Sequence, residues 1–83
     1  MSERYRVQAI VDHIFGELGD VISEHVTLSD AQEMAERVAA ARHAAGYRGA
    51  VIVNDAFTDQ RVWMNEEAKK IYDGLIRDYG LGT

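Results

Sequence analysis

The clearest pattern along the chain is a set of apolar positions three and four residues apart between residues 31 and 45. This spacing places them on one stripe of an α-helix. Ser29 and Gln32 match the S-x-x-Q capping box that precedes many helices, and Gly46 is the residue type that most often ends one. We therefore predict a helix over residues 30–45. It is expected to pack on a sheet through a stripe made mostly of alanine: Ala31, Met34, Ala35, Val38, Ala41 and Ala45.

A second pattern follows this helix, where residues 50–53 read Ala-Val-Ile-Val and are apolar at every position. A strand with one solvated face alternates apolar and polar residues, whereas a continuous apolar run is typical of a strand covered on both faces. Gly49 precedes the run. We expect this segment to be the central strand of the sheet.

The amino-terminal part of the chain fits two structures. As a strand, residues 5–11 place Tyr5, Val7, Ala9 and Val11 on one face. As a helix, residues 3–18 also form an apolar stripe that ends at Gly19. The β-branched content and the glycine at position 16 favour the strand, and the helix is kept as the alternative.

If residues 5–11 form a strand, residues 13–20 form a loop that exposes Phe15 and Leu18. Residues 21–28 then return as an antiparallel strand. Its inward-facing residues are expected to be Ile22, Val26 and Leu28.

The last third of the chain predicts a strand and a helix. Short polar residues between 54 and 60 indicate a turn, and residues 61–64 form a short strand. Asn65 is a good helix N-cap, and Gly80 marks the helix end before a loose tail over residues 80–83. The apolar stripe of this helix is Ala68, Ile71, Tyr72, Leu75, Ile76 and Tyr79.

These elements predict an α+β fold with the order ββαββα. We expect a two-layer sandwich: a four-stranded, mostly antiparallel sheet with both helices on one face and the other face open. No linker or low-complexity segment divides the sequence, so residues 1–83 are expected to form a single domain.

Composition limits the classes of function. The chain has 83 residues, no cysteine and a formal net charge of −5, so disulfides, thiolate metal sites and cysteine nucleophiles are excluded. No stretch predicts a signal peptide or a membrane span, and the expected location is the cytoplasm. The acidic balance opposes direct nucleic-acid binding, which needs clustered cations. Arg4, Arg6 and Arg61 form too sparse a basic strip to change this.

No motif in the chain predicts a catalytic or metal-binding chemistry. His13, His25 and His43 have no metal-ligand spacing. Asp55 and Asp59 are better explained as turn residues than as a cation site. No nucleophile elbow or glycine-rich phosphate loop is present. We predict a protein that is not an enzyme and needs no cofactor or metal.

The remaining prediction is a small binding or regulatory module that acts by contact with an unidentified protein. In size, acidity and lack of catalytic motifs the chain is similar to small phage-encoded proteins, among them anti-CRISPR proteins. This likeness of composition implies an inhibitor of a nucleic-acid-handling complex, whose carboxylates replace phosphates on the target. The candidate acidic residues are Glu17, Asp20, Glu24, Glu33, Glu36, Asp55 and Asp59, and the candidate apolar anchors are Phe15, Leu18 and Trp63.

Three alternatives are open at this point. A homodimer or larger homo-oligomer would bury an edge strand or the open sheet face. An enzyme or small-ligand carrier would need a concave pocket with convergent polar groups. A nucleic-acid-binding sheet would stack bases on Tyr5 and Trp63.

Overall fold

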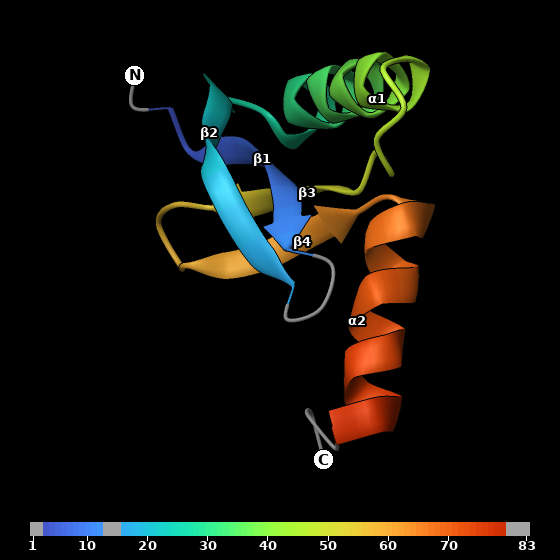
Figure 1. The fold of residues 1–83 in the computed structure, drawn as a ribbon. Helices are drawn as coiled ribbons and strands as arrows, with labels where there is room; N and C mark the ends of the chain where they lie inside the picture. The colour runs from blue at the N-terminus through green and yellow to red at the C-terminus, as the bar shows by residue number, and fades with distance from the viewer. Residues whose placement is uncertain (1–2, 13–15, 80–83) are drawn as a thin grey trace.

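The computed structural model describes residues 3–12 and 16–79, and its elements follow the predicted order ββαββα. The four strands form one antiparallel sheet in the order β2-β1-β3-β4 (Figure 1). The α+β prediction is confirmed, and the alternative helix over residues 3–18 is wrong, because residues 5–12 are extended. The elements are β1 (Tyr5–Asp12), β2 (Glu17–His25), α1 (Leu28–Ala44), β3 (Val51–Asp55), β4 (Gln60–Met64) and α2 (Glu66–Tyr79).

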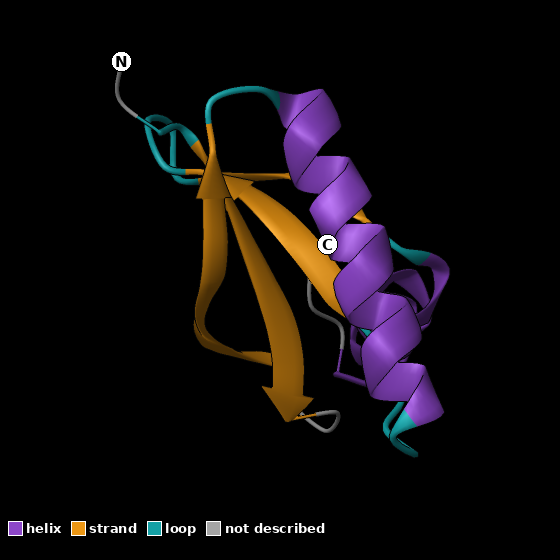
Figure 2. Ribbon diagram, turned by 90° about the horizontal axis from the view of Figure 1, so that it is seen from above, coloured by secondary structure: helices purple, strands orange, loops and turns teal. Residues whose placement is uncertain are grey.

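The two helices pack on opposite faces of the sheet, which corrects the expectation that they share one face. On β3, Val51 and Val53 pack with residues of α1, whereas Ile52 packs with residues of α2. Figure 2 shows α1 lying along one side of the sheet. The physical reason is the continuous apolar run of β3. Successive side chains of a strand point to opposite faces, so a sheet covered on one face only would leave Ile52 or the two valines in water.

Helix α1 begins two residues earlier than predicted. The N-cap is Thr27, whose side-chain oxygen accepts a hydrogen bond from the backbone N–H of Asp30 at 3.2 Å. This earlier start brings Leu28 into contact with the cluster under α1. At the other end, Gly46 has a positive φ of 90° and donates to the carbonyl of His43, as the predicted glycine stop requires.

The apolar stripe of α1 is buried only along its first half. Ala31 and Ala35 are fully buried, whereas Ala41 and Ala45 are exposed because the last turns of the helix extend past the residues of the core. Gly49 lies against this helix and has a φ of +75°, and a Cβ there would be 2.9 Å from the carbonyl oxygen of Ala39. The glycine thus allows the chain to enter β3 directly beneath α1.

Strand β2 differs most from its prediction. It starts at Glu17 rather than at residue 21, and its pairing with β1 is interrupted by register shifts. As a result Leu18 packs against the core beside α2, while Ile22 and Val26, expected to face inward, are exposed. Leu28 belongs to α1. Phe15 and the predicted tail over residues 80–83 lie outside the described residues.

Two identical substitutions in α1 test its close packing on the sheet. Ala35→Leu places a larger side chain in a filled space, and we expect it to lower the free energy of unfolding by about 1–3 kcal/mol. Ala41→Leu, on the exposed part of the same helix, is expected to change it by less than about 0.5 kcal/mol. Urea unfolding followed by circular dichroism measures both, and equal effects would contradict the packing described here.

Two glycine substitutions test the backbone at residue 49. Gly49→Ala is expected to lower the free energy of unfolding by more than about 1 kcal/mol, because it combines a positive φ with a backbone clash. Gly74→Ala is the control, since Gly74 lies within α2 and a Cβ there meets no atom within 4 Å beyond its chain neighbours and the adjacent turns of the helix backbone. The control should raise thermal stability, because alanine is favoured over glycine in a helix by about 1 kcal/mol.

Candidate functional site

Strand β4 forms one edge of the sheet, and two surface hollows lined by described residues border it. The first has a volume of about 330 Å³ and extends from α1 to the start of α2. The second, of about 300 Å³, runs along β4 itself. Trp63, Met64 and Lys69 line both hollows. The first is completed by Glu36, Ala39, Asn65 and Glu66, and the second by Arg61 and Val62.

Trp63 and Met64 are held by opposite sides of the sheet. Trp63 pairs with Val53 and packs on the cluster under α1, whereas Met64 pairs with Ile52 and packs on the cluster under α2. Both side chains are half-buried. The edge of β4 therefore presents two large apolar side chains that are fixed by the core and still reach solvent.

A β-bulge in β4 separates these two residues from Arg61. Trp63 lies opposite Val53 and Arg61 lies opposite Asn54, so Val62 is an extra residue without its own partner. Val62 is 39% exposed. Bulges on edge strands interrupt the regular array of free backbone groups and hinder the addition of another strand.

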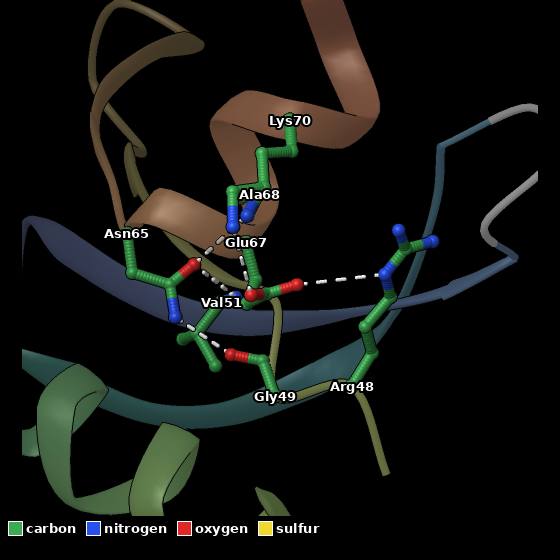
Figure 3. A network of polar contacts seen from close by, with 7 residues as sticks. All are labelled: Arg48, Gly49, Val51, Asn65, Glu67, Ala68 and Lys70. Carbon is green, nitrogen blue, oxygen red and sulfur yellow. Dashed lines mark hydrogen bonds and ion pairs between the residues drawn. The ribbon is translucent and has the colours of Figure 1, made fainter. Parts of the chain in front are cut away.

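The carboxamide of Asn65 fixes the corner between β4 and α2 (Figure 3). Its Oδ1 accepts the backbone N–H groups of Ala68 at 3.0 Å and Val51 at 3.1 Å, and its Nδ2 donates to the carbonyl of Gly49 at 2.6 Å. The predicted N-cap role is confirmed by the first contact. The other two contacts tie the start of β3 to the same corner and hold α2 beside β4.

The charged side chains around this corner are loosely paired and exposed to solvent. Glu67 lies 3.5 Å from both Arg48 and Lys70, and Lys69 lies 3.5 Å from Glu66. Exposed ion pairs of this kind contribute little to stability. Lys69, at the rim of both hollows, can therefore exchange its partner for a ligand group at small cost.

A second group of side chains, around Arg4 and Asp55, stabilises the fold. The Nε and Nη2 atoms of Arg4 donate to the two carboxylate oxygens of Asp55 at 3.0 and 2.7 Å. One of these oxygens also accepts the backbone N–H of Phe57 at 2.9 Å. The guanidinium group lies 5.5 Å from the ring centre of Tyr5 and 5.3 Å from that of Phe57. This arrangement joins β1 to the β3–β4 turn.

Asp55 therefore does not serve as a surface carboxylate, which corrects its place among the interaction candidates. It is only 4% exposed, and both its oxygens are occupied. The hydrogen bond from Arg4, helped by those from the turn backbone, lowers the pKa of Asp55 to about 2. The sequence predicted a turn residue here and did not reveal its partner, which is distant in the chain.

The other acidic candidates are divided between the two edges of the sheet. Glu17, Asp20 and Glu24 are exposed on β2, at the edge opposite β4. Glu36 lines the first hollow, and Asp59 lies in the β3–β4 turn. Glu33 forms an ion pair with Arg37 at 2.8 Å. These residues do not form one acidic surface.

The structure also shows exposed side chains that the sequence analysis did not select. Phe57 is 63% exposed in the turn after β3, and Tyr47 is 62% exposed after α1. The sequence does contain one indication that Phe57 is exposed, because this aromatic residue lies among short polar residues that form a turn. Met64 follows Trp63 directly in the sequence, whereas Lys69, on α2, joins them only through the fold.

Histidine and carboxylate side chains do not converge on a metal site in the part of the chain that the structure describes. His25 is within 2.9 Å of the hydroxyl of Ser23, and His43 lies on the exposed side of α1. His13 lies outside the described residues. Within the same ranges, no helix is long and apolar enough to cross a membrane.

Comparison of the chain with protein-family models, curated proteins and solved structures finds no significant match. Function must therefore be inferred from the surfaces described above.

The Asp55 contact predicts a specific dependence of stability on pH. An aspartate in an unfolded chain has a pKa of about 3.9, and the pKa of Asp55 in the folded protein is lower. The group therefore stabilises the fold above pH 4, and this contribution is lost as the pH falls from about 4 to about 2. Asp55→Asn should lower the urea midpoint at pH 7 and flatten its decline across this acid range.

Asp59→Asn is the matched control, because Asp59 lies in the same turn, is exposed and has a positive φ of 56° that asparagine also accepts. It should leave the urea midpoint at pH 7 nearly unchanged. The same pH profile for the two variants would contradict the role assigned to Asp55.

Proposed function

We propose that this protein is a small binding module that captures a segment of another protein at the edge of β4, with Trp63 as the main anchor. The observation that carries the proposal is the position of Trp63. It is half-buried against the core and lines both hollows at a sheet edge. Tryptophan is among the residues most often found at the energetic centre of protein interfaces.

The geometry favours the docking of side chains over the addition of a strand. The bulge at Val62 interrupts the outer edge of β4, so a partner strand would find few regularly spaced backbone groups there. The two hollows instead offer apolar contact with Trp63 and Met64, surrounded by charged side chains. An apolar centre with a polar rim is the usual arrangement of a protein interface.

The alternative functions have less support from the described residues. The hollows are at the lower end of the volumes typical of small-ligand sites, about 300–1,000 Å³. A homodimer through an edge strand is disfavoured, because register shifts interrupt both β2 and β4. The inhibitor that replaces phosphates with carboxylates stays a prediction. The division of its acidic candidates between two edges does not favour it.

A capture experiment with surface variants tests this proposal. Tagged full-length protein is incubated with nuclease-treated lysate of the native host, and bound proteins are identified by mass spectrometry. Trp63→Ala should reduce recovery of the specific partner more than tenfold, since loss of a central anchor costs about 2 kcal/mol or more. Tyr47→Ala is the matched control, because it removes an exposed aromatic ring that lines neither hollow.

Because Trp63 also packs on the core, a second variant separates binding from folding. Val62→Glu adds a charge at a partly exposed position in the second hollow. It should weaken capture while leaving the circular dichroism spectrum and urea midpoint near those of the wild type. If Trp63→Ala and Val62→Glu both retain the partner that wild type and Tyr47→Ala retain, the proposed site is wrong.

A further inference from the structure

Three polar residues form a row across the sheet on the face that packs against α2. Arg6 lies opposite Asn54 on the neighbouring strand, and Asn54 lies opposite Arg61 on the next. Asn54 is two residues beyond Ile52 and shares its face, but the row lies outside the cluster that α2 covers. Arg6 and Arg61 are exposed and Asn54 is half-buried. We refer to Arg6, Asn54 and Arg61 as the arginine row.

Contacts with neighbouring residues hold two members of this row in place. The guanidinium group of Arg61 lies over the ring of Tyr72, 4.0 Å from its centre. The Nδ2 of Asn54 donates to the side-chain oxygen of Gln8 at 2.9 Å, and Gln8 in turn donates to the carbonyl of Gly19 at 3.0 Å. These contacts limit the orientations of Arg61 and Asn54 before any ligand arrives.

The two arginines of the row differ from most cations in the described part of the chain. Neither Arg6 nor Arg61 forms an ion pair there, although Glu24 lies opposite Arg6 on β2. The cations that do pair with a carboxylate are Arg4, Arg37, Arg48, Lys69 and Lys70. In a protein with a net charge of −5, the arginine row is thus a local group of two positive charges that are not held in ion pairs within the described residues.

The spacing of the row suits a ligand with two separate carboxylates. Adjacent strands are about 4.8 Å apart, so the backbones of Arg6 and Arg61 are separated by about 10 Å. Each guanidinium group can bind one carboxylate through two parallel hydrogen bonds. Asn54, between them, can meet a peptide group of the same ligand.

We propose that the segment bound at the β4 edge is acidic, and that its carboxylates are recognised by Arg6 and Arg61. This inference rests on the proposed function, because Arg61 also lines the second hollow with Trp63 and so joins the two surfaces. A protein segment with a few carboxylates is favoured over a nucleic acid. The negative net charge of the chain repels a polyanion at long range, whereas a short acidic segment has little such repulsion.

The test uses two synthetic peptides that differ only in charge. Both are capped octapeptides. One has two glutamates four positions apart, followed by three apolar residues that extend past Arg61 into the second hollow, and the other has glutamine in place of both glutamates. Each is titrated into ¹⁵N-labelled full-length protein at low salt, and dissociation constants are taken from amide shifts in NMR spectra. Wild type should bind the glutamate peptide about fivefold more tightly, as two exposed arginine–carboxylate pairs can supply. The shifts should include Arg6, Asn54 and Arg61.

The double variant Arg6→Gln/Arg61→Gln should bind both peptides equally. Arg37→Gln is the matched control, because Arg37 is an exposed arginine on α1, and it should keep the fivefold preference. Equal binding of both peptides by wild type, no binding of either peptide, or a preference that persists in the double variant would overturn the inference. Tighter binding of a ten-nucleotide single-stranded DNA that is lost in the double variant would also overturn it in favour of nucleic acid.

Trp63→Ala distinguishes the failure of this inference from that of the proposed function. If the β4 edge is the docking site, this variant weakens binding of both peptides by the same factor and leaves their ratio unchanged. If Trp63→Ala weakens binding but wild type shows no preference for the glutamate peptide, the docking site at β4 is supported and the acidic partner is rejected.

Discussion

The structure depends on the burial of β3 on both of its faces. Val51 and Val53 on one face and Ile52 on the other are fully buried, so each helix must occupy its own side of the sheet. A chain of 83 residues has too little apolar surface for a thick core. The limited apolar surface is instead buried in two thin layers, one on each face of β3. The small side chains of Ala31 and Ala35 allow α1 to lie close to the sheet.

This arrangement also creates the candidate site. Because β3 is central, β4 becomes an edge, and its successive side chains are held by different layers: Trp63 by the α1 side and Met64 by the α2 side. The helices approach the same edge from opposite faces, and a hollow forms where side chains of both meet β4. Asn65 fixes this meeting point, since one carboxamide binds the backbones of the β3 entry and of α2. Packing on the core thus fixes the positions of the apolar side chains at this edge, and a partner would contact an ordered surface.

The sequence correctly predicted the features that depend on neighbouring residues. Its predictions were wrong for features that depend on contacts between residues distant in the chain. The glycine stop at Gly46, the buried run of β3 and the Asn65 cap are local patterns, and all are confirmed. The apolar run of β3 required a cover on each face, and assigning both helices to one face ignored that requirement.

The limits of β2 could not be found from the sequence, because its register shifts depend on pairing with β1. The sequence predicts Asp55 as a turn residue and as a candidate surface carboxylate, and nothing near it in the chain reveals its pairing with Arg4. Trp63 was selected by residue type, but the hollows beside it arise only from the packing of α1 and α2.

The apolar and the charged parts of the proposed surface have different physical roles. In the proposed complex, contact with Trp63 and Met64 would remove apolar area from water and would supply most of the affinity. Exposed arginines add little affinity each, because water and salt screen their charge. In the proposed complex they would favour one orientation of the partner, since a carboxylate at another position would meet no guanidinium group and would lie near other carboxylates of the protein. On this view the arginine row selects which apolar segment binds and in which direction it lies, while the edge of β4 determines how tightly it is held.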